Sequence, residues 1–182
     1  MSSKPLRLGK SIIVSAPSGA GKTTTAKALA ETSGSPKVHL HCDDFWHFIR
    51  HGAIPPFLES AHKQNETVVK VLAQAAEGYA KGGYFVIVDG VVGPWFLEVF
   101  TGLSVRLHYI VLQIDVESAI ARCQSRGGDT LTDAKAIASL HRQLSSLGVL
   151  SKHALDVRGL SPELTLAAVI AAVESEKFLL NA

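Results

Sequence analysis

The ten residues "SAPSGAGKTT", residues 15–24, lie between two segments of opposite character. The apolar run "SIIVS" (11–15) before them is typical of a buried β-strand, and the segment at 21–32 after them favours a helix. Glycines let a loop turn its N–H groups toward one point, and a helix N-terminus adds partial positive charge there. A glycine-rich loop in this setting that ends in Lys-Thr predicts a phosphate-binding loop.

The same pattern predicts the cofactors, ATP and Mg²⁺. We expect Lys22 to bridge the β- and γ-phosphates, Thr23 to ligate Mg²⁺ through its hydroxyl, and Thr24 to contact the α-phosphate. Lys22 is therefore also a predicted catalytic residue, because it places positive charge beside the transferred group. The predicted nucleotide-binding residues are Ala16, Pro17, Ser18, Gly19, Ala20, Gly21, Lys22, Thr23 and Thr24.

One position departs from the strict GxxxxGK[ST] pattern. Ala16 stands where the first glycine of the pattern would allow a tight turn out of the strand. Alanine is the smallest alternative, so the match is weakened only slightly. The competing interpretation is a glycine turn beside an incidental lysine.

Short apolar runs alternate with longer helical patterns along the rest of the chain. This alternation indicates parallel strands joined by crossover helices, which is an α/β doubly wound fold. The predicted strands are 11–15, 37–42, 84–89, 107–115 and about 154–157. The predicted helices are 21–32, a long one with the stripe Ala61, Asn65, Val68, Leu72, Ala76 and Tyr79, 116–126, one capped at Thr130 to Asp133 and ending near 147, and a last one starting at Ser161 and Pro162.

With the stretches "SAPSGAGKTTTAKAL" and "VIVDG", Asp43 and the later arginines, the chain resembles the P-loop small-molecule kinases of the nucleoside-monophosphate-kinase type. That group includes shikimate and gluconate kinases and chloramphenicol phosphotransferases. The resemblance implies a three-layer P-loop NTPase fold with a five-stranded parallel sheet in the order 2-3-1-4-5. It also implies one domain over residues 1–182, with an acceptor-binding segment at about 43–65 and a lid at about 122–135.

Three aspartates are candidates for the chemistry of phosphoryl transfer. Asp43 closes the predicted second strand, and ligands of doubly wound sheets bind at the carboxyl ends of strands. The resemblance implies that Asp43 contacts the acceptor hydroxyl as a base, because "DDFW" is similar to the "DxFY" stretch of uridine-type kinases. Asp44 either supports Asp43 or holds metal-bound water. The alternative for both acids is an Asx turn or helix cap.

Asp89 ends the most hydrophobic predicted strand, "YFVIVD". The resemblance implies that it contacts Mg²⁺ through water, so Thr23, Asp89 and Asp44 are the metal candidates. The alternative for Asp89 is a strand-terminal turn, because Asp-Gly is a common turn dipeptide.

Three arginines are candidates for binding the phosphates. Arg122 and Arg126 are four residues apart on one predicted helix face, and Arg142 follows on the next helix. The resemblance places them at the lid, where arginines stack on adenine or clamp phosphates, and Arg126 is the predicted catalytic one. The alternative is a solvated arginine on a helix surface.

Size and composition exclude several classes of protein. The length of 182 residues suits one domain. The 18 basic and 16 acidic residues are spread along the chain, and no basic block of the kind that binds nucleic acid is present in the sequence. Two distant cysteines predict reduced thiols, and the longest apolar run, 164–173, is too short to span a bilayer. We therefore expect a cytoplasmic monomer or homodimer that binds no membrane. His39 and His41 alternate on one strand face, but no acid-rich spacing accompanies them to favour a metal site.

The predicted function is an ATP-dependent kinase that transfers the γ-phosphoryl group to a hydroxyl of a small molecule. The acceptor and the base of the nucleotide stay open. The alternatives are a P-loop ATPase that acts as a nucleotide-dependent switch, a toxin-like sugar-nucleotide kinase, and a nucleotide-binding protein without activity.

Overall fold

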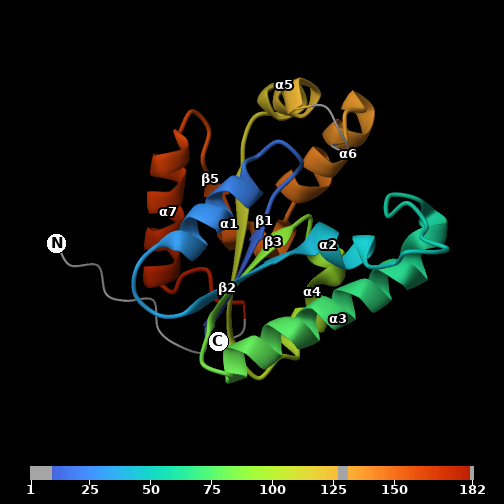
Figure 1. Ribbon diagram of the computed structural model, residues 1–182. Helices are drawn as coiled ribbons and strands as arrows, with labels where there is room; N and C mark the ends of the chain where they lie inside the picture. Colours follow the sequence, from blue (N-terminus) through green and yellow to red (C-terminus); the bar gives the residue numbers. More distant parts are fainter. Residues whose placement is uncertain (1–9, 127–130, 181–182) are drawn as a thin grey trace.

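A five-stranded parallel sheet forms the centre of the molecule (Figure 1). The computed structural model describes residues 10–126 and 131–180. The strand order is β2-β3-β1-β4-β5, which confirms the predicted fold and order. The strands are β1 (Lys10–Ser15), β2 (Lys37–His41), β3 (Phe85–Gly90), β4 (Arg106–Gln113) and β5 (Ala154–Asp156).

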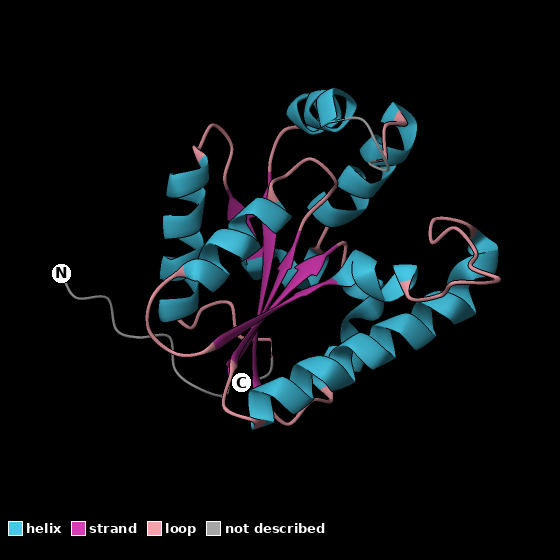
Figure 2. Cartoon of the chain, viewed as in Figure 1, coloured by secondary structure: helices cyan, strands magenta, loops and turns pink. Residues whose placement is uncertain are grey.

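Helices cover both faces of the sheet, which gives three layers (Figure 2). One core cluster joins α1, α5 and α7 to one face, and a second joins α3 and α4 to the other. The helices are α1 (Lys22–Glu31), α2 (Cys42–His47), α3 (His62–Lys81), α4 (Leu97–Thr101), α5 (Val116–Arg126), α6 (Ala134–Ser145) and α7 (Pro162–Glu174), with 3₁₀ turns at Glu59–Ala61, Pro94–Phe96 and Gly148–His153.

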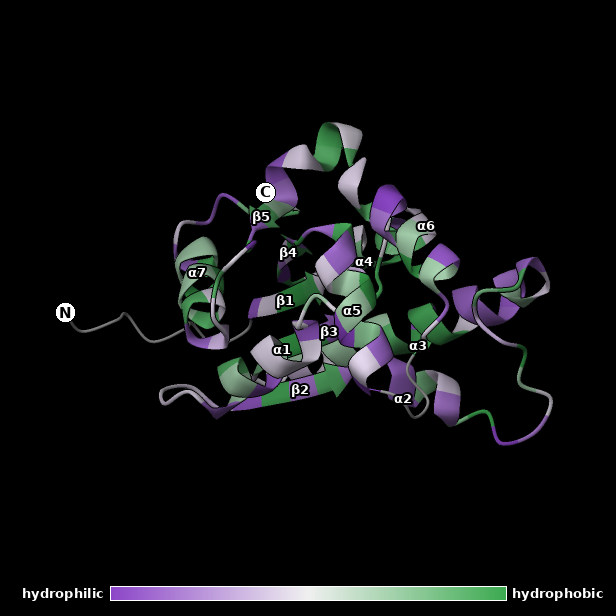
Figure 3. Ribbon diagram, turned by 90° about the horizontal axis from the view of Figure 1, so that it is seen from above, coloured by the Kyte–Doolittle hydropathy of each residue, from purple (hydrophilic) through white to green (hydrophobic). Residues whose placement is uncertain are grey.

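The central strands are buried on both faces. Every residue of β1 and β3 is buried, and hydrophobic residues predominate on β1 in Figure 3. A strand covered by helices on both sides needs apolar residues at successive positions, which is why these two segments read as continuous apolar runs. No helix among the described residues is both long and apolar enough to cross a membrane.

Three local predictions were wrong. The second strand ends at His41, because Cys42 already begins α2. The side chain of Asp133 accepts hydrogen bonds from the backbone N–H groups of Lys135 and Ala136, so this residue caps α6 and the helix begins after it. Thr130, the predicted cap, lies outside the described residues.

The third concerns the long helix α3, whose last predicted core position was one residue early. Tyr79 is 45% exposed, whereas Ala80 is buried. The other five residues of the predicted stripe are buried.

The segment after α7 returns to the sheet and covers a buried histidine on β4. Leu180 donates a backbone hydrogen bond to Leu107, and Tyr109 donates one to Phe178. His108, between these two β4 residues, is fully buried, and neither ring nitrogen has a hydrogen-bond partner among the described residues. Burial, together with the nearby charges of Lys10 and Arg106, lowers the pKa of His108 to about 4.

We predict that His108 makes stability fall in acid. The unfolded chain takes up this proton near its ordinary pKa of 6.5 and the folded chain only near 4, so stability is full above pH 6.5 and declines as the pH falls from 6.5 to 4. The loss is about 3 kcal/mol at most. His108→Phe should flatten this part of the pH profile, measured by urea unfolding at successive pH values.

The exposed His62, which pairs with Glu66, supplies the control. His62→Phe should keep the slope of the wild-type protein between pH 6.5 and 4. An equal slope in His108→Phe and the wild-type protein would contradict the prediction.

Candidate functional site

The phosphate loop joins the buried end of β1 to the first turn of α1. Gly19 and Gly21 have φ angles of 84° and 82°, in the left-handed region that glycine adopts without strain. Gly19 also lies against α5, where an added Cβ would meet the backbone oxygen of Ala119 at 2.4 Å. The conformation of the loop and the packing of α5 on it therefore both depend on glycine.

The N-terminus of α1 is open to an anion. Gly21 is its N-cap, no side chain among the described residues caps it, and its first turn contains no acidic residue. The first N–H groups of a helix have no partner within the helix, so they and the helix dipole are available to a phosphate.

Ala16 fits the position of the missing glycine. Its side chain is fully buried in the core cluster on the α1 face of the sheet. Its φ angle is not positive, since Glu176 is the only non-glycine residue with positive φ in the described part of the chain. A methyl group is therefore accommodated without backbone strain.

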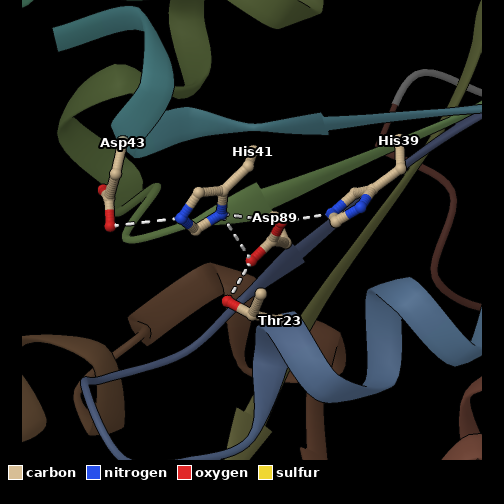
Figure 4. Close-up of polar contacts among 5 residues, drawn as sticks. All are labelled: Thr23, His39, His41, Asp43 and Asp89. Carbon is tan, nitrogen blue, oxygen red and sulfur yellow. Dashed lines mark hydrogen bonds and ion pairs between the residues drawn. The ribbon is translucent and has the colours of Figure 1, made fainter. Parts of the chain in front are cut away.

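Asp89 is the centre of a polar cluster beside this loop (Figure 4). The hydroxyl of Thr23 donates to Asp89 Oδ2 at 2.6 Å. His39 Nε2 lies 2.5 Å from Asp89 Oδ1, and His41 Nδ1 lies 3.0 Å from Oδ1 and 3.1 Å from Oδ2. Thr23, the second residue of α1, and the two histidines of β2 thus contact the same carboxylate of β3.

The carboxylate of Asp89 is fully buried and ionised. Burial alone would raise its pKa, but the hydrogen bonds of His39 and Thr23, with the charge and hydrogen bond of His41, lower the pKa below its usual value. An ionised carboxylate only accepts hydrogen bonds, so the ring nitrogens that face it are the donors.

The oxygens of Thr23 and Asp89 fit Mg²⁺. Mg²⁺ prefers hard oxygen ligands and keeps several waters, so it is usually held by one or two protein groups together with substrate phosphates. A hydroxyl and an ionised carboxylate in contact beside an anion-binding loop are such a pair. Among residues 10–126 and 131–180, no group of three or more His, Cys, Asp or Glu side chains is placed to hold a metal ion.

Asp43 lies in the first turn of α2, not at the end of β2 as predicted. Its Oδ2 is 3.5 Å from His41 Nε2, and its side chain is 64% exposed. Asp44 is exposed in the same turn. Both acids thus remain at the carboxyl edge of the sheet, but on a helix that the sequence did not predict.

Gly90 brings this helix close to β3. A Cβ at Gly90 would lie 2.3 Å from the sulfur of Cys42, the first residue of α2. Burial raises the pKa of the Cys42 thiol, the charges of Asp89 and Asp43 raise it further, and Lys22 opposes them. The charges of the predicted lysine and of two predicted acids thus all act on this buried sulfur.

The three predicted arginines are exposed, and they lie on two different helices. Arg126 lies on α5, the helix that packs on the phosphate loop, and both Arg126 and Lys22 lower the pKa of Cys123, which burial raises. Arg122 is on the same helix and Arg142 on α6. Within the described ranges no hydrogen bond or ion pair joins the following residues to the Asp89 cluster: Asp44, Arg122, Arg126 and Arg142.

The contacts of His39 and His41 with Asp89 were not predicted from the sequence. Their alternation did place them on one face of the second strand, and that signal was available. Their partner became identifiable only through the sheet register, in which His41 pairs with Asp89 on the neighbouring strand.

Most of the chain matches one protein family. A family model described as an AAA domain matches residues 12–138, which include the phosphate loop, Asp43, Asp89 and Arg126. A comparison with curated protein sequences finds no match.

Several solved structures have a similar fold. The tunicamycin resistance protein of Deinococcus radiodurans has a TM-score of 0.70 at 16% identity, covering 90% of this chain and 95% of that chain. Thymidylate kinase from Candida albicans has a TM-score of 0.68 at 16% identity, covering 96% of each chain. A gluconokinase from Sinorhizobium meliloti 1021 has a TM-score of 0.63 at 16% identity, covering 93% of this chain and 94% of that chain. The fold is thus like that of P-loop small-molecule kinases.

We predict unequal costs for alanine at the two loop glycines. Gly21→Ala meets nothing within 4 Å and should cost about 1 kcal/mol of stability, from the positive φ alone. Gly19→Ala adds the clash with Ala119 and should cost more than about 2 kcal/mol. Urea unfolding of both variants measures the difference, and equal losses would show that the contact between the loop and α5 does not matter.

Proposed function

The chain belongs to the AAA domain family, and on that premise we propose that it is an ATP-dependent kinase that phosphorylates a hydroxyl of a small molecule. The observation that carries this proposal is the chain of contacts from Thr23 through Asp89 and His41 to Asp43. It connects the phosphate loop to an exposed carboxylate beside which an acceptor can bind.

The phosphate side of the site would be formed by the loop at 16–21 and the first turn of α1. Its N–H groups and the Lys22 ammonium would bind the phosphates, while Thr23 and Asp89 would hold Mg²⁺. Bound there, the ion would neutralise charge on the phosphates. Arg126, on the helix that packs against this loop, is the arginine we assign to the transferred group, with Arg122 and Arg142 on the lid side.

The acceptor side would be formed by Asp43. The acceptor oxygen would form a bond to the γ-phosphorus as the bond from that phosphorus to the bridging oxygen of ADP breaks, and the hydroxyl proton would pass to the Asp43 carboxylate. Asp43 suits this step because it lies at the carboxyl edge of the sheet and is open to solvent. Asp44, one residue further along the same turn, would assist by holding water.

A cavity supports the acceptor-binding segment at about 43–65. It has a volume of about 360 Å³ and lies between α2 and α3. Its lining is mainly apolar: Phe45, Phe48, Ile49, Gln64, Thr67, Val68 and Val71. Both polar ends of the Gln64 amide are bonded to the backbone of Ile54, so the walls favour an apolar part of the acceptor. An acceptor that reached from Asp43 into this cavity would lie along α2, whose six residues span about 9 Å.

We predict that Lys22 and Asp43 affect different measurements. Lys22→Ala should abolish phosphoryl transfer and weaken ATP binding, because it removes the charge that faces the phosphates. Asp43→Asn should change the Kd for ATP only a few-fold but lower kcat by about 10²- to 10⁴-fold. Calorimetry and steady-state kinetics measure the two effects.

Asp44→Asn is the matched comparison, since it removes the neighbouring exposed carboxylate. It should lower kcat less than Asp43→Asn does. Unchanged turnover in Asp43→Asn would remove Asp43 from the acceptor side.

We predict that ADP release depends on the acceptor. Purified protein with Mg²⁺ and ATP should release ADP slowly until a suitable hydroxyl compound is added. The panel contains sugars, nucleosides, nucleotides, aminoglycosides and hydroxylated compounds with an aryl group. If only a protein or nucleic acid stimulates ADP release, with water as acceptor, the kinase proposal fails and the nucleotide-dependent switch replaces it.

A further inference from the structure

We propose that His41 is a positioning residue that couples the two halves of the phosphoryl-transfer site. One ring nitrogen faces Asp89 on the metal side, and the other faces Asp43 on the acceptor side (Figure 4). The assignment of these two sides rests on the proposed function. The coupling between Asp43 and Asp89 through His41 can be measured without an acceptor.

The sheet fixes His41 against Asp89. The two residues are register partners on the neighbouring parallel strands β2 and β3. His41 Nδ1 is 3.0 Å from one oxygen of the carboxylate and 3.1 Å from the other. With Asp89 fully buried and the His41 side chain only 27% exposed, this contact is shielded from water.

Fixing one edge of the ring also fixes the other. An imidazole is rigid and planar, so an Nδ1 held at Asp89 determines where Nε2 points. Nε2 points toward Asp43 Oδ2 at 3.5 Å, which is an ion-pair distance for a ring that carries protons on both nitrogens. Because Asp43 is 64% exposed, it would otherwise sample several rotamers, and the His41 ring restricts it to those that face the site.

The same contacts transmit a change from one side to the other. Thr23 donates to Asp89 Oδ2, the oxygen that His41 also contacts. If Thr23 turned its hydroxyl to a bound metal, the Asp89 carboxylate would lose one of its donors and would be held by the two histidines alone. A shift of the His41 ring would then move Nε2, the nitrogen that faces Asp43.

His39 provides a natural comparison on the same strand. Its Nε2 also contacts Asp89 Oδ1, at 2.5 Å, yet no contact between His39 and Asp43 occurs among the described residues. If the histidines serve only to stabilise the buried carboxylate, the two are equivalent. If His41 couples the two sides, only His41 links changes at Asp43 to binding on the metal side.

The test is a double-mutant cycle that measures the Kd for Mg²⁺·ADP by calorimetry. Asp43→Asn should change this Kd about threefold or more in the wild-type background and not at all in His41→Phe, because residues in contact act non-additively. His39→Phe should weaken binding by itself about tenfold, and in this background Asp43→Asn should keep its wild-type effect.

A conservative variant separates the two contacts of His41. The amide of His41→Asn places a donor near the position of Nδ1 and nothing near Nε2. It should bind Mg²⁺·ADP nearly as the wild-type protein does and still lose the effect of Asp43→Asn. This variant also keeps the test valid if His41→Phe fails to fold, and thermal unfolding without ligand checks each protein.

Additive effects in every background would overturn the coupling while leaving the kinase proposal intact. Equal coupling through His39 and His41 would also overturn it, since a shared structural role then explains both. Coupling in Mg²⁺·ADP binding without phosphorylation of any acceptor would support this inference and count against the proposed function alone. A wild-type protein that does not bind Mg²⁺·ADP would overturn both.

Discussion

The site depends on the parallel ladder that places β1 between β3 and β4. In its register Val14 pairs with Asp89 and Ser15 pairs with Gly90. The residue that leads into the phosphate loop and the carboxylate of β3 therefore end at the same edge of the sheet. A slip in this register would take the buried Asp89 carboxylate away from Thr23, which follows β1 and donates to it, and is therefore disfavoured.

The buried carboxylate of Asp89 imposes a second constraint on its neighbours. An ionised carboxylate without partners is costly to bury, so its oxygens must be bonded from the surrounding elements. Thr23 and the two histidines of β2 supply these bonds. The groups that stabilise Asp89 are thereby brought to the phosphate loop and to Asp43, and one set of contacts serves both the fold and the site.

The elements that could be predicted are those with a strong local signal. The five strands were recognised from short apolar runs, and the loop from its glycines with Lys22 and Thr23. The short helix α2 was missed because its six residues, "CDDFWH", are too few to show a helical period. For the same reason Asp43 was assigned to a strand end, although its position at the carboxyl edge of the sheet was predicted.

By itself the sequence determined the order of strands and helices along the chain and the position of the phosphate loop, because periodicity and glycine positions are local properties of the chain. The order of the strands in the sheet followed from family resemblance. Only the tertiary structure decided that His41 lies between Asp43 and Asp89. That arrangement joins His41 to a carboxylate 48 positions distant along the chain, and it depends on strand register and on the close packing of Cys42 against Gly90. Neither feature leaves a periodic trace in the sequence, because each is set by contacts between segments rather than within one.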